Sequence, residues 1–440
     1  MAIRSYVDLS AFVRFLHVEQ HDIDDAVSQV LLADDASPEQ LLEMYMRQLN
    51  HQLPVTFHEG YHYWQGLRLP YLHRHAVLMF MEMTRCFVQL ARTDSDWHRW
   101  AGYIDSSLPT LGGQKHIWFD GDDVILSELA TAVGPDSPPN CTLSALDLVE
   151  TAASLAEFQV LGTGDSRVDP IKFGRWAKRH PTYRGAYDYV SRVLGDRQLA
   201  LRCTLPMINA SFETTDPVRT FCSLGRYLTH LQDAGKIDDF VAQDEPCQWG
   251  PLFRSMLDAF EYDAGGEVGD LFDTSYYRVD LDNWVNARLS RPGTVDGIHP
   301  IITSEARAWS DISAAKPFYG WLLDQPGWLS DDQIQEALRV FSPITIMRLH
   351  AGQDRDRVIP VGRRGGASLL VSELLMIQGA VRRAAGESAL VTDSRLCCHA
   401  ECPEYVDNYC NNFVSIPQQW SECKFPERMK AAIERMRNQD

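Results

Sequence analysis

Apolar side chains recur along much of the chain at spacings of three and four residues, which is the pattern of amphipathic helices. The clearest case is 37–49, where Ser37 can cap the helix, Pro38 can occupy its first position and Gln40 completes a capping box. Further helices are predicted, after an interruption at Pro54, over 55–68, 72–92, 125–133, 142–162, 217–234, 303–324, 331–349 and 367–385.

Strand patterns are few and short, and the two candidates are 115–119 and 199–203. The sequence therefore predicts a mainly α fold with few short strands. We expect one mainly helical region over 1–390, followed by a small Cys-rich segment with a terminal helix over 391–440.

The chain has 440 residues, of which 45% are hydrophobic, and its formal net charge is -19. Such acidity argues against non-specific binding to nucleic acid or anionic membranes, because both require a basic face. No stretch reaches the roughly 18 consecutive apolar residues of a membrane span, and Asp8 and Arg14 interrupt the N-terminal apolar run. We expect a soluble, cytoplasmic protein with no nucleic-acid or membrane partner, while the sequence predicts no particular oligomeric state.

One predicted helix carries a His-Glu-x-x-His motif, formed by His58, Glu59, Gly60, Tyr61 and His62. Positions i and i+4 share a helix face, so both imidazoles can reach one metal ion. Glu59 lies one step around the helix, where its carboxylate can take a proton from a water on that metal. The motif predicts a zinc site with His58 and His62 as ligands and Glu59 as catalytic base.

Other interpretations of this helix stay open. The two histidines could simply be hydrogen-bonded on a surface helix without binding metal. Glu59 and His62 also form half of a carboxylate di-iron motif, but no other Glu of the chain has a His three residues later. Gly60 costs about 1 kcal/mol inside a helix relative to Ala and could let a neighbouring backbone or a substrate approach closely.

The sequence specifies the third zinc ligand less directly than the two histidines of the motif. Catalytic zinc usually has three protein ligands and one open position. The metzincin extension is excluded, because its Gly and His positions hold Gln65 and Arg68. A glutamate from a later helix is the remaining common solution, and Glu128 is a reserve candidate for it.

The stronger candidates lie in the helix predicted over 142–162, with Thr142 as N-cap and Gly162 as terminator. Glu150 and Glu157 share one stripe of this helix with Leu143, Leu146 and Ala153. A carboxylate on an apolar stripe needs a partner, because its burial without one is costly. We predict Glu150 as the third ligand and Glu157 as a residue that supports the ligands; exposure to solvent or pairing with Arg is the alternative.

The segment HEGYHYWQ, followed by ETAASLAE, resembles the HExxHxxQ … ExxA pattern of gluzincin-type metallopeptidases and of many uncharacterised bacterial HExxH proteins. The resemblance covers roughly 54–70 and 142–162. It implies a zincin-like helical core and peptidase activity. It also assigns zinc ligation and proton transfer to His58, His62, Glu150 and Glu59.

The chain has 10 Cys, and half of them lie in the Cys-rich segment. Four thiolates for a structural zinc could come from Cys398, Cys402, Cys410 and Cys423. Cys397 and His399 are alternates, and an iron–sulfur cluster or unliganded thiols and disulfides are the other interpretations. The scattered cysteines are expected to be buried as small apolar groups: Cys86, Cys141, Cys203, Cys222 and Cys247.

Together these features predict a zinc-dependent metallohydrolase, most simply a peptidase that cleaves amide bonds in a protein or peptide substrate. Two alternatives are an inactive or regulatory zincin-like binding protein and a zinc hydrolase of a non-peptide amide. Hydrolysis also needs a hydrogen-bond donor for the oxyanion. Spacing selects none of the candidates, which are His73, His75, Tyr61 and several later tyrosines.

Overall fold

A computed structural model describes the part of the chain that contains the motif helix and its surroundings. The described residues are 5–8, 13–31, 38–73, 76, 143–162, 169–177, 181–214, 217–237, 249–262, 298–341, 343–350 and 356–361. Several predictions lie outside these ranges: most of the helix over 72–92, the segments 115–119, 125–133 and 367–385, Glu128, His75 and the Cys-rich segment over 391–440. Within the described residues the chain is mainly helical, as the sequence predicts.

The described strands form one four-stranded sheet in the order β1-β2-β3-β4. Their bounds are Tyr6–Asp8 for β1, Val13–Glu19 for β2, Ile344–His350 for β3 and Asp356–Val361 for β4. The central strands β2 and β3 are parallel, whereas the outer pairs β1–β2 and β3–β4 are antiparallel. The sheet therefore joins segments from opposite ends of the sequence.

The sheet corrects one helix prediction. The helix predicted over 331–349 is α17 only over Asp331–Val340, and residues 344–349 belong to strand β3. Ser330 caps α17 through a capping box with Gln333. The β-branched residues after the helix favour a strand, and pairing with β2, more than three hundred residues earlier, stabilises it.

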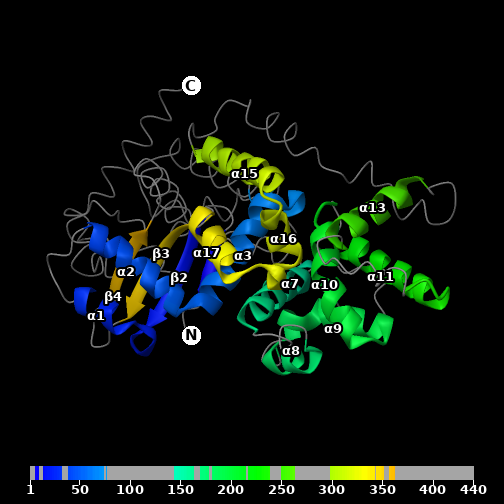
Figure 1. The fold of residues 1–440 in the computed structure, drawn as a ribbon, viewed down its shortest axis with the longest axis horizontal. Helices are drawn as coiled ribbons and strands as arrows, with labels where there is room; N and C mark the ends of the chain where they lie inside the picture. The colour runs from blue at the N-terminus through cyan, green and yellow to red at the C-terminus, as the bar shows by residue number, and fades with distance from the viewer. Residues whose placement is uncertain are drawn as a thin grey trace, which may run out of the picture.

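The N-terminal helices lie beside the sheet and lead to the motif helix. After η1 (Gln20–Asp22) and α1 (Asp25–Leu31), α2 spans Pro38–His51, which confirms the helix predicted over 37–49. The motif helix α3 then spans Leu53–Arg68 with Pro54 in its first turn, where proline is tolerated. Figure 1 shows α3 between the sheet and the other large group of helices, and α3 contacts both β2 and α7.

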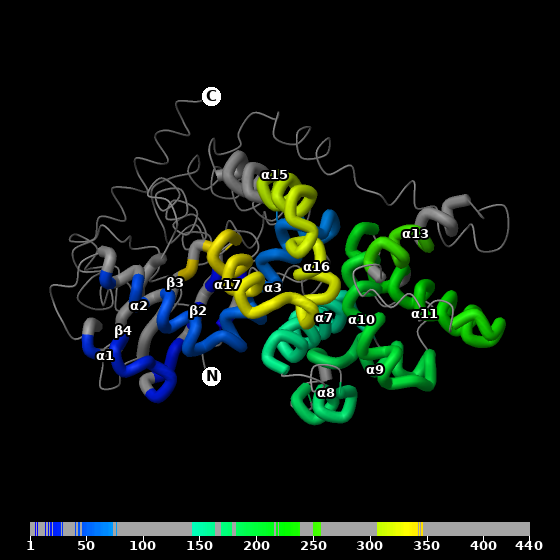
Figure 2. Tube along the Cα trace, viewed as in Figure 1, coloured from blue at the N-terminus to red at the C-terminus, as the bar shows by residue number. Residues whose placement is uncertain are grey.

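That second group consists of α7 and the elements that follow it. Their bounds are Ala145–Leu161 for α7, Pro170–Trp176 for α8, Pro181–Arg184 for η5, Gly185–Leu194 for α9, Arg197–Ser211 for α10, Pro217–Asp233 for α11 and Trp249–Tyr262 for α13. Helix α11 matches the prediction over 217–234. Figure 2 follows the chain through this group.

Helices α7 and α10 correct two details. The residues 199–203 are helical rather than a strand, because Asp196 caps α10 by accepting from the backbone N–H groups of Gln198 and Leu199. A short apolar run cannot by itself distinguish a strand from the buried face of a helix. The N-cap of α7 is Ser144 rather than Thr142, since Ser144 and Asp147 form a capping box, while Gly162 ends the helix as predicted.

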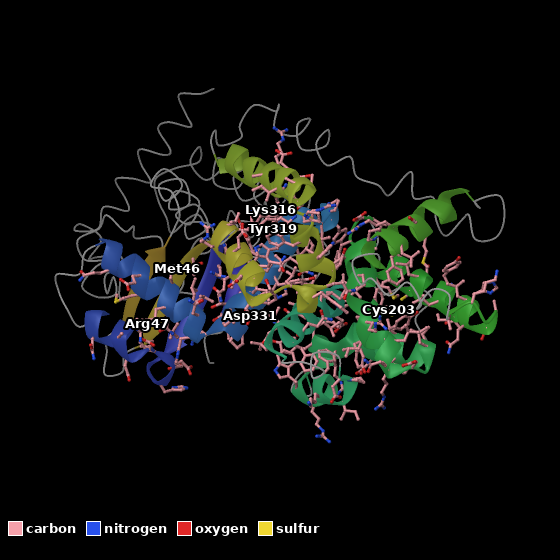
Figure 3. The ribbon with its side chains drawn as sticks, in the orientation of Figure 1. Met46, Arg47, Cys203, Lys316, Tyr319 and Asp331 are labelled. Atoms are coloured by element: carbon pink, nitrogen blue, oxygen red, sulfur yellow. The ribbon has the colours of Figure 1, made fainter. Side chains whose placement is uncertain are left out.

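The helix predicted over 303–324 is divided in two. Helix α15 spans Ile298–Ala315 and α16 spans Phe318–Asp324, with Pro317 between them. The short η9 (Pro326–Trp328) then leads to α17. Lys316 pairs with Glu336 of α17 at 2.5 Å, and Figure 3 labels Lys316 beside Tyr319 at this junction. None of the helices in the described ranges is long and apolar enough to cross a membrane.

A continuous apolar core surrounds α3 and α7. Trp64 is fully buried, and its indole N–H donates to the carbonyl oxygen of Phe341 at 2.8 Å, which fixes α3 to the end of α17. On α7, the small side chains of Ala152, Ala153 and Ala156 are also fully buried. Small side chains let neighbouring helices approach closely, and this packing holds the acidic residues of α7 near the motif helix.

Candidate metal centre

His58 and His62 lie next to each other on one face of α3. Their ring centroids are 4.9 Å apart with the rings nearly perpendicular. Both side chains are largely buried, with exposed fractions of 13% and 12%. The spacing of one helical turn thus brings the two imidazoles together, as expected for positions i and i+4.

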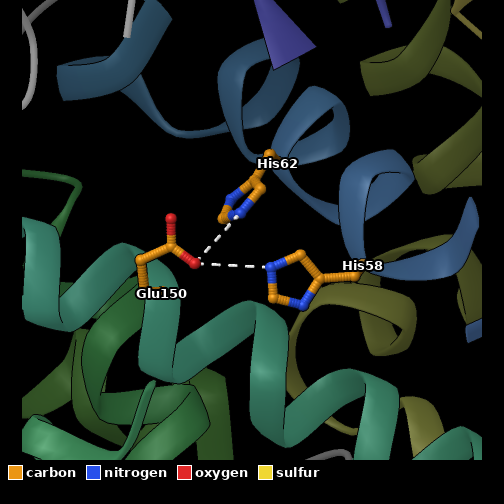
Figure 4. Close-up of side chains that lie close together, drawn as sticks. All are labelled: His58, His62 and Glu150. Atoms are coloured by element: carbon orange, nitrogen blue, oxygen red, sulfur yellow. Dashed lines mark hydrogen bonds and ion pairs between the residues drawn. The ribbon is translucent and has the colours of Figure 1, made fainter. Parts of the chain in front are cut away.

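Glu150 of α7 approaches both imidazoles from across the helix interface (Figure 4). Its Oε2 atom is 3.3 Å from Nε2 of His58 and 3.6 Å from Nε2 of His62. Donors arranged tetrahedrally around zinc at about 2.0–2.2 Å are about 3.3–3.6 Å from one another. These three residues therefore form a group that could hold a metal ion, and no other such group occurs in the described ranges.

A second carboxylate lies on the other side of His58. Oε2 of Glu157 is 3.0 Å from Nδ1 of His58. With Nδ1–H donating to Glu157, Nε2 is the nitrogen that faces Glu150, and in the neutral imidazole Nε2 would be free to bind a metal ion. The structure thus brings Glu157 to the position expected of a residue that supports a ligand.

Gln65 makes the corresponding contact with His62. Its Oε1 atom is 3.2 Å from Nδ1 of His62, and its side chain is fully buried. In the sequence, Gln65 excludes the metzincin extension and ends the HExxHxxQ pattern, but neither feature predicted its contact with His62. The signal that could have identified it is its spacing, because a residue three positions after His62 shares its helix face.

Neighbouring charges shift the pKa values of His58 and Glu150 in the metal-free protein. Burial alone would lower the pKa of His58, but Glu150, Glu157 and Glu59 outweigh burial and raise it well above the usual range. Burial would raise the pKa of Glu150, but His62 and His58 outweigh that effect and hold it well below the usual range. The carboxylates around His58 therefore favour a positive charge between them, which in the metal-free protein is carried by a proton on the imidazole.

Glu59 is 8% exposed and lies on the same helix as the two histidines. Burial raises its pKa, and the neighbouring His58 and His62 offset this effect only in part. A carboxylate with a raised pKa is better suited to hold a proton than an ordinary surface glutamate. The guanidinium of Arg14 acts in the opposite direction and lowers this pKa.

Arg14 was not singled out from the sequence as part of the site. It is fully buried on β2, where Nη1 donates to the carbonyl oxygen of Thr56 at 3.0 Å and Nε donates to the hydroxyl of Thr345 at 3.1 Å. A Cβ on Gly60 would lie 3.3 Å from Nη1 of Arg14. The glycine within the motif thus permits the close approach of an arginine side chain.

Two of the candidate oxyanion donors, Tyr61 and His73, lie within the described residues, and both contact backbone carbonyl oxygens. The Tyr61 hydroxyl donates to the carbonyl oxygen of Leu323 and accepts from Nδ2 of Asn209, so it belongs to the core. His73 is buried with its Nδ1 2.9 Å from the carbonyl oxygen of Gly66. His75 lies outside the described residues.

The aromatic ring that lies against the site is Tyr183, at 5.9 Å from the ring centroid of His58. Tyr183 belongs to η5, which Thr151 of α7 fixes by donating to the carbonyl oxygen of Thr182 and accepting from the N–H of Ala186. The helix that carries Glu150 therefore also positions this tyrosine. No spacing in the sequence distinguishes Tyr183 from the other tyrosines.

Two of the scattered cysteines are described. Cys203 and Cys222 are buried free thiols, as expected for small apolar groups, and burial raises the pKa of Cys203. The possible structural site at Cys398, Cys402, Cys410 and Cys423 lies outside the described residues.

No protein-family model, curated protein or solved structure matches the chain. The similarity to gluzincin-type metallopeptidases therefore stays a prediction from the two sequence segments. The geometry of His58, His62 and Glu150 is therefore the main indication of a function.

Proposed function

We propose that the chain is a zinc-dependent metallohydrolase, most simply a peptidase, with His58, His62 and Glu150 as the zinc ligands. One observation carries this proposal. One carboxylate oxygen lies 3.3 and 3.6 Å from the Nε2 atoms of two imidazoles in a largely buried group, and these two distances suit donors that share a zinc ion. Nitrogen and oxygen donors of this kind, in a three-residue set, are typical of catalytic zinc sites, which keep a further position for water or substrate.

The side chains around the proposed zinc site have separate roles in the reaction. When bound, zinc supplies Lewis acidity toward a carbonyl oxygen and lowers the pKa of water to about 7. Glu59 holds the proton that the attacking water loses and can deliver it to the leaving group. Glu157 orients the imidazole of His58 through its Nδ1 atom, at 3.0 Å. Burial of the group excludes bulk water and strengthens each electrostatic interaction.

Metal analysis of the purified chain tests the proposal. We expect up to two zinc per chain, of which one is lost in His58→Ala, His62→Ala or Glu150→Ala. The pair Cys402→Ser and Cys410→Ser is the matched control, because it affects only the possible structural zinc. A wild-type chain that neither contains zinc nor binds it in a titration would overturn the proposal.

Glu59→Gln separates an enzyme from a zincin-like binding protein. This substitution keeps the size of the side chain and removes its ability to accept a proton at neutral pH. We expect full zinc content and a loss of hydrolysis by several orders of magnitude, measured on a peptide library. Hydrolysis at the wild-type rate in this variant would exclude Glu59 as base, and a library that is not cleaved would shift the proposal to a non-peptide amide.

A further inference from the structure

Gln65 is a buried amide on the motif helix, one turn after His62. Its side chain is fully buried. Residues three positions apart share a helix face, so Gln65 lies on the side of α3 that carries the imidazole of His62. The residue therefore belongs to the immediate surroundings of the proposed zinc site.

The contact between the two side chains has a definite chemical consequence. Oε1 of Gln65 is an acceptor, and it lies 3.2 Å from Nδ1 of His62. Nδ1 must therefore carry the proton and donate it to Gln65. In the neutral imidazole the lone pair is then on Nε2, the atom that lies 3.6 Å from Oε2 of Glu150. An apolar residue at position 65 would leave either tautomer of His62 available.

The other end of the Gln65 amide adds an independent observation. Its Nε2 atom is buried and makes no hydrogen bond within the described part of the chain. A buried donor without an acceptor costs free energy, whereas an apolar side chain of similar size would not. Within the described residues, the amide therefore makes its contact through the carbonyl oxygen, and that oxygen faces His62.

Charge explains why the partner is an amide rather than a second carboxylate. Glu157 already supports His58, and Glu150 faces both imidazoles. These two carboxylates can balance the two positive charges of a zinc ion, while Glu59 has the nearby charge of Arg14. A further carboxylate at position 65 would add a buried negative charge without a counter-ion.

From these contacts we infer that Gln65 is a positioning residue that holds His62 in the metal-binding tautomer and orientation. This inference rests on the proposed zinc site. It predicts unequal effects on two properties of one variant. Removing the amide should weaken zinc binding and change the stability of the metal-free fold little, because the unpaired donor of Gln65 disappears while Nδ1–H of His62 loses its acceptor.

The test uses full-length Gln65→Leu and the unbranched variant Gln65→Met. Zinc affinity is measured by competition with a chromophoric chelator, with and without Cys402→Ser plus Cys410→Ser, so that the C-terminal thiols are separated from the site. Thermal unfolding of the metal-free protein is measured in parallel. We expect a loss of about 10–100-fold in zinc affinity and a melting temperature close to that of the wild type.

Two further variants control the interpretation. Gln65→Glu keeps an acceptor for Nδ1–H and should recover most of the zinc affinity. Thr56→Val removes another buried polar group of α3, whose Oγ1 has no hydrogen-bond partner among the described residues, and should leave zinc affinity unchanged. The contrast separates the Gln65 contact from general effects of buried polar groups.

The outcomes distinguish this inference from the proposed function. If the wild type binds zinc and both Gln65→Leu and Gln65→Met bind it equally well, the inference is wrong and the zinc site stands. If the apolar variants lose zinc affinity only in proportion to a lower melting temperature of the metal-free protein, the role is structural and the inference is also wrong. If the wild type binds no zinc, the proposed function itself fails.

Discussion

Glu157 and His58 are joined by a contact of 3.0 Å between Oε2 and Nδ1, on the opposite side of the imidazole from Glu150. The two carboxylates come from the same helix α7, two turns apart. One imidazole therefore lies between a carboxylate that can share a metal with it and one that can only orient it.

This arrangement predicts unequal effects of two substitutions at position 157. Glu157→Ala removes the acceptor for Nδ1–H and should lower zinc affinity by about 10–100-fold. Glu157→Gln keeps an acceptor and should lower it by less. Competition titrations on the metal-free protein measure both. Equal affinities in the wild type and the two variants would show that this carboxylate does not support the zinc site.

A second prediction concerns Arg14, which ties α3 to the sheet. Arg14→Met leaves the acceptors on Thr56 and Thr345 without their buried donor, so we expect a loss of about 1–3 kcal/mol in the free energy of unfolding. Arg47→Met is the control, because Arg47 pairs with Asp24 at the surface with 58% of its side chain exposed, and exposed pairs contribute about 1 kcal/mol or less. Urea denaturation compares the variants, and equal losses would contradict the buried role of Arg14.

A third prediction compares two helical glycines, of which Gly250 lies against the buried carboxylate of Asp324. A Cβ on Gly250 would lie 2.0 Å from Oδ2 of Asp324, so Gly250→Ala should destabilise the fold by about 1–3 kcal/mol. Gly320 of α16 has no atom within 4 Å of the corresponding Cβ, and Gly320→Ala should instead stabilise by about 0.4–1 kcal/mol. Thermal unfolding measures whether each substitution lowers or raises the stability of the fold. A neutral Gly250→Ala would mean that Asp324 can move aside without cost.

The fourth prediction concerns the reactivity of the buried thiols. Burial raises the pKa of Cys203, so little thiolate exists at neutral pH, and Cys222 is equally inaccessible. Neither residue should react with iodoacetamide in the native protein, and both should react in urea. Peptide mass spectrometry identifies the alkylated cysteines. Rapid alkylation of Cys203 without denaturant would contradict its position in the core.

The outcome of the helix predictions has a simple physical basis. Helix α2 was predictable because its expected capping residues and its apolar spacing are local sequence signals, and such local signals usually agree with the folded structure. The segments 199–203 and 344–349 were assigned wrongly because short apolar or β-branched runs suit either structure. Hydrogen-bond partners decide between them: the Asp196 cap makes the first a helix, and pairing with β2 makes the second a strand.

The sequence by itself determined that His58 and His62 share a face of one helix and that Glu150 and Glu157 share a stripe of another. Both follow from the 3.6-residue period, which needs no tertiary information. Only the tertiary structure decided which carboxylate meets which nitrogen, that Gln65 supports His62, and that Arg14 lies against Gly60. Those contacts depend on how α3 packs against α7 and the sheet, and this packing arises from side chains far apart in the sequence.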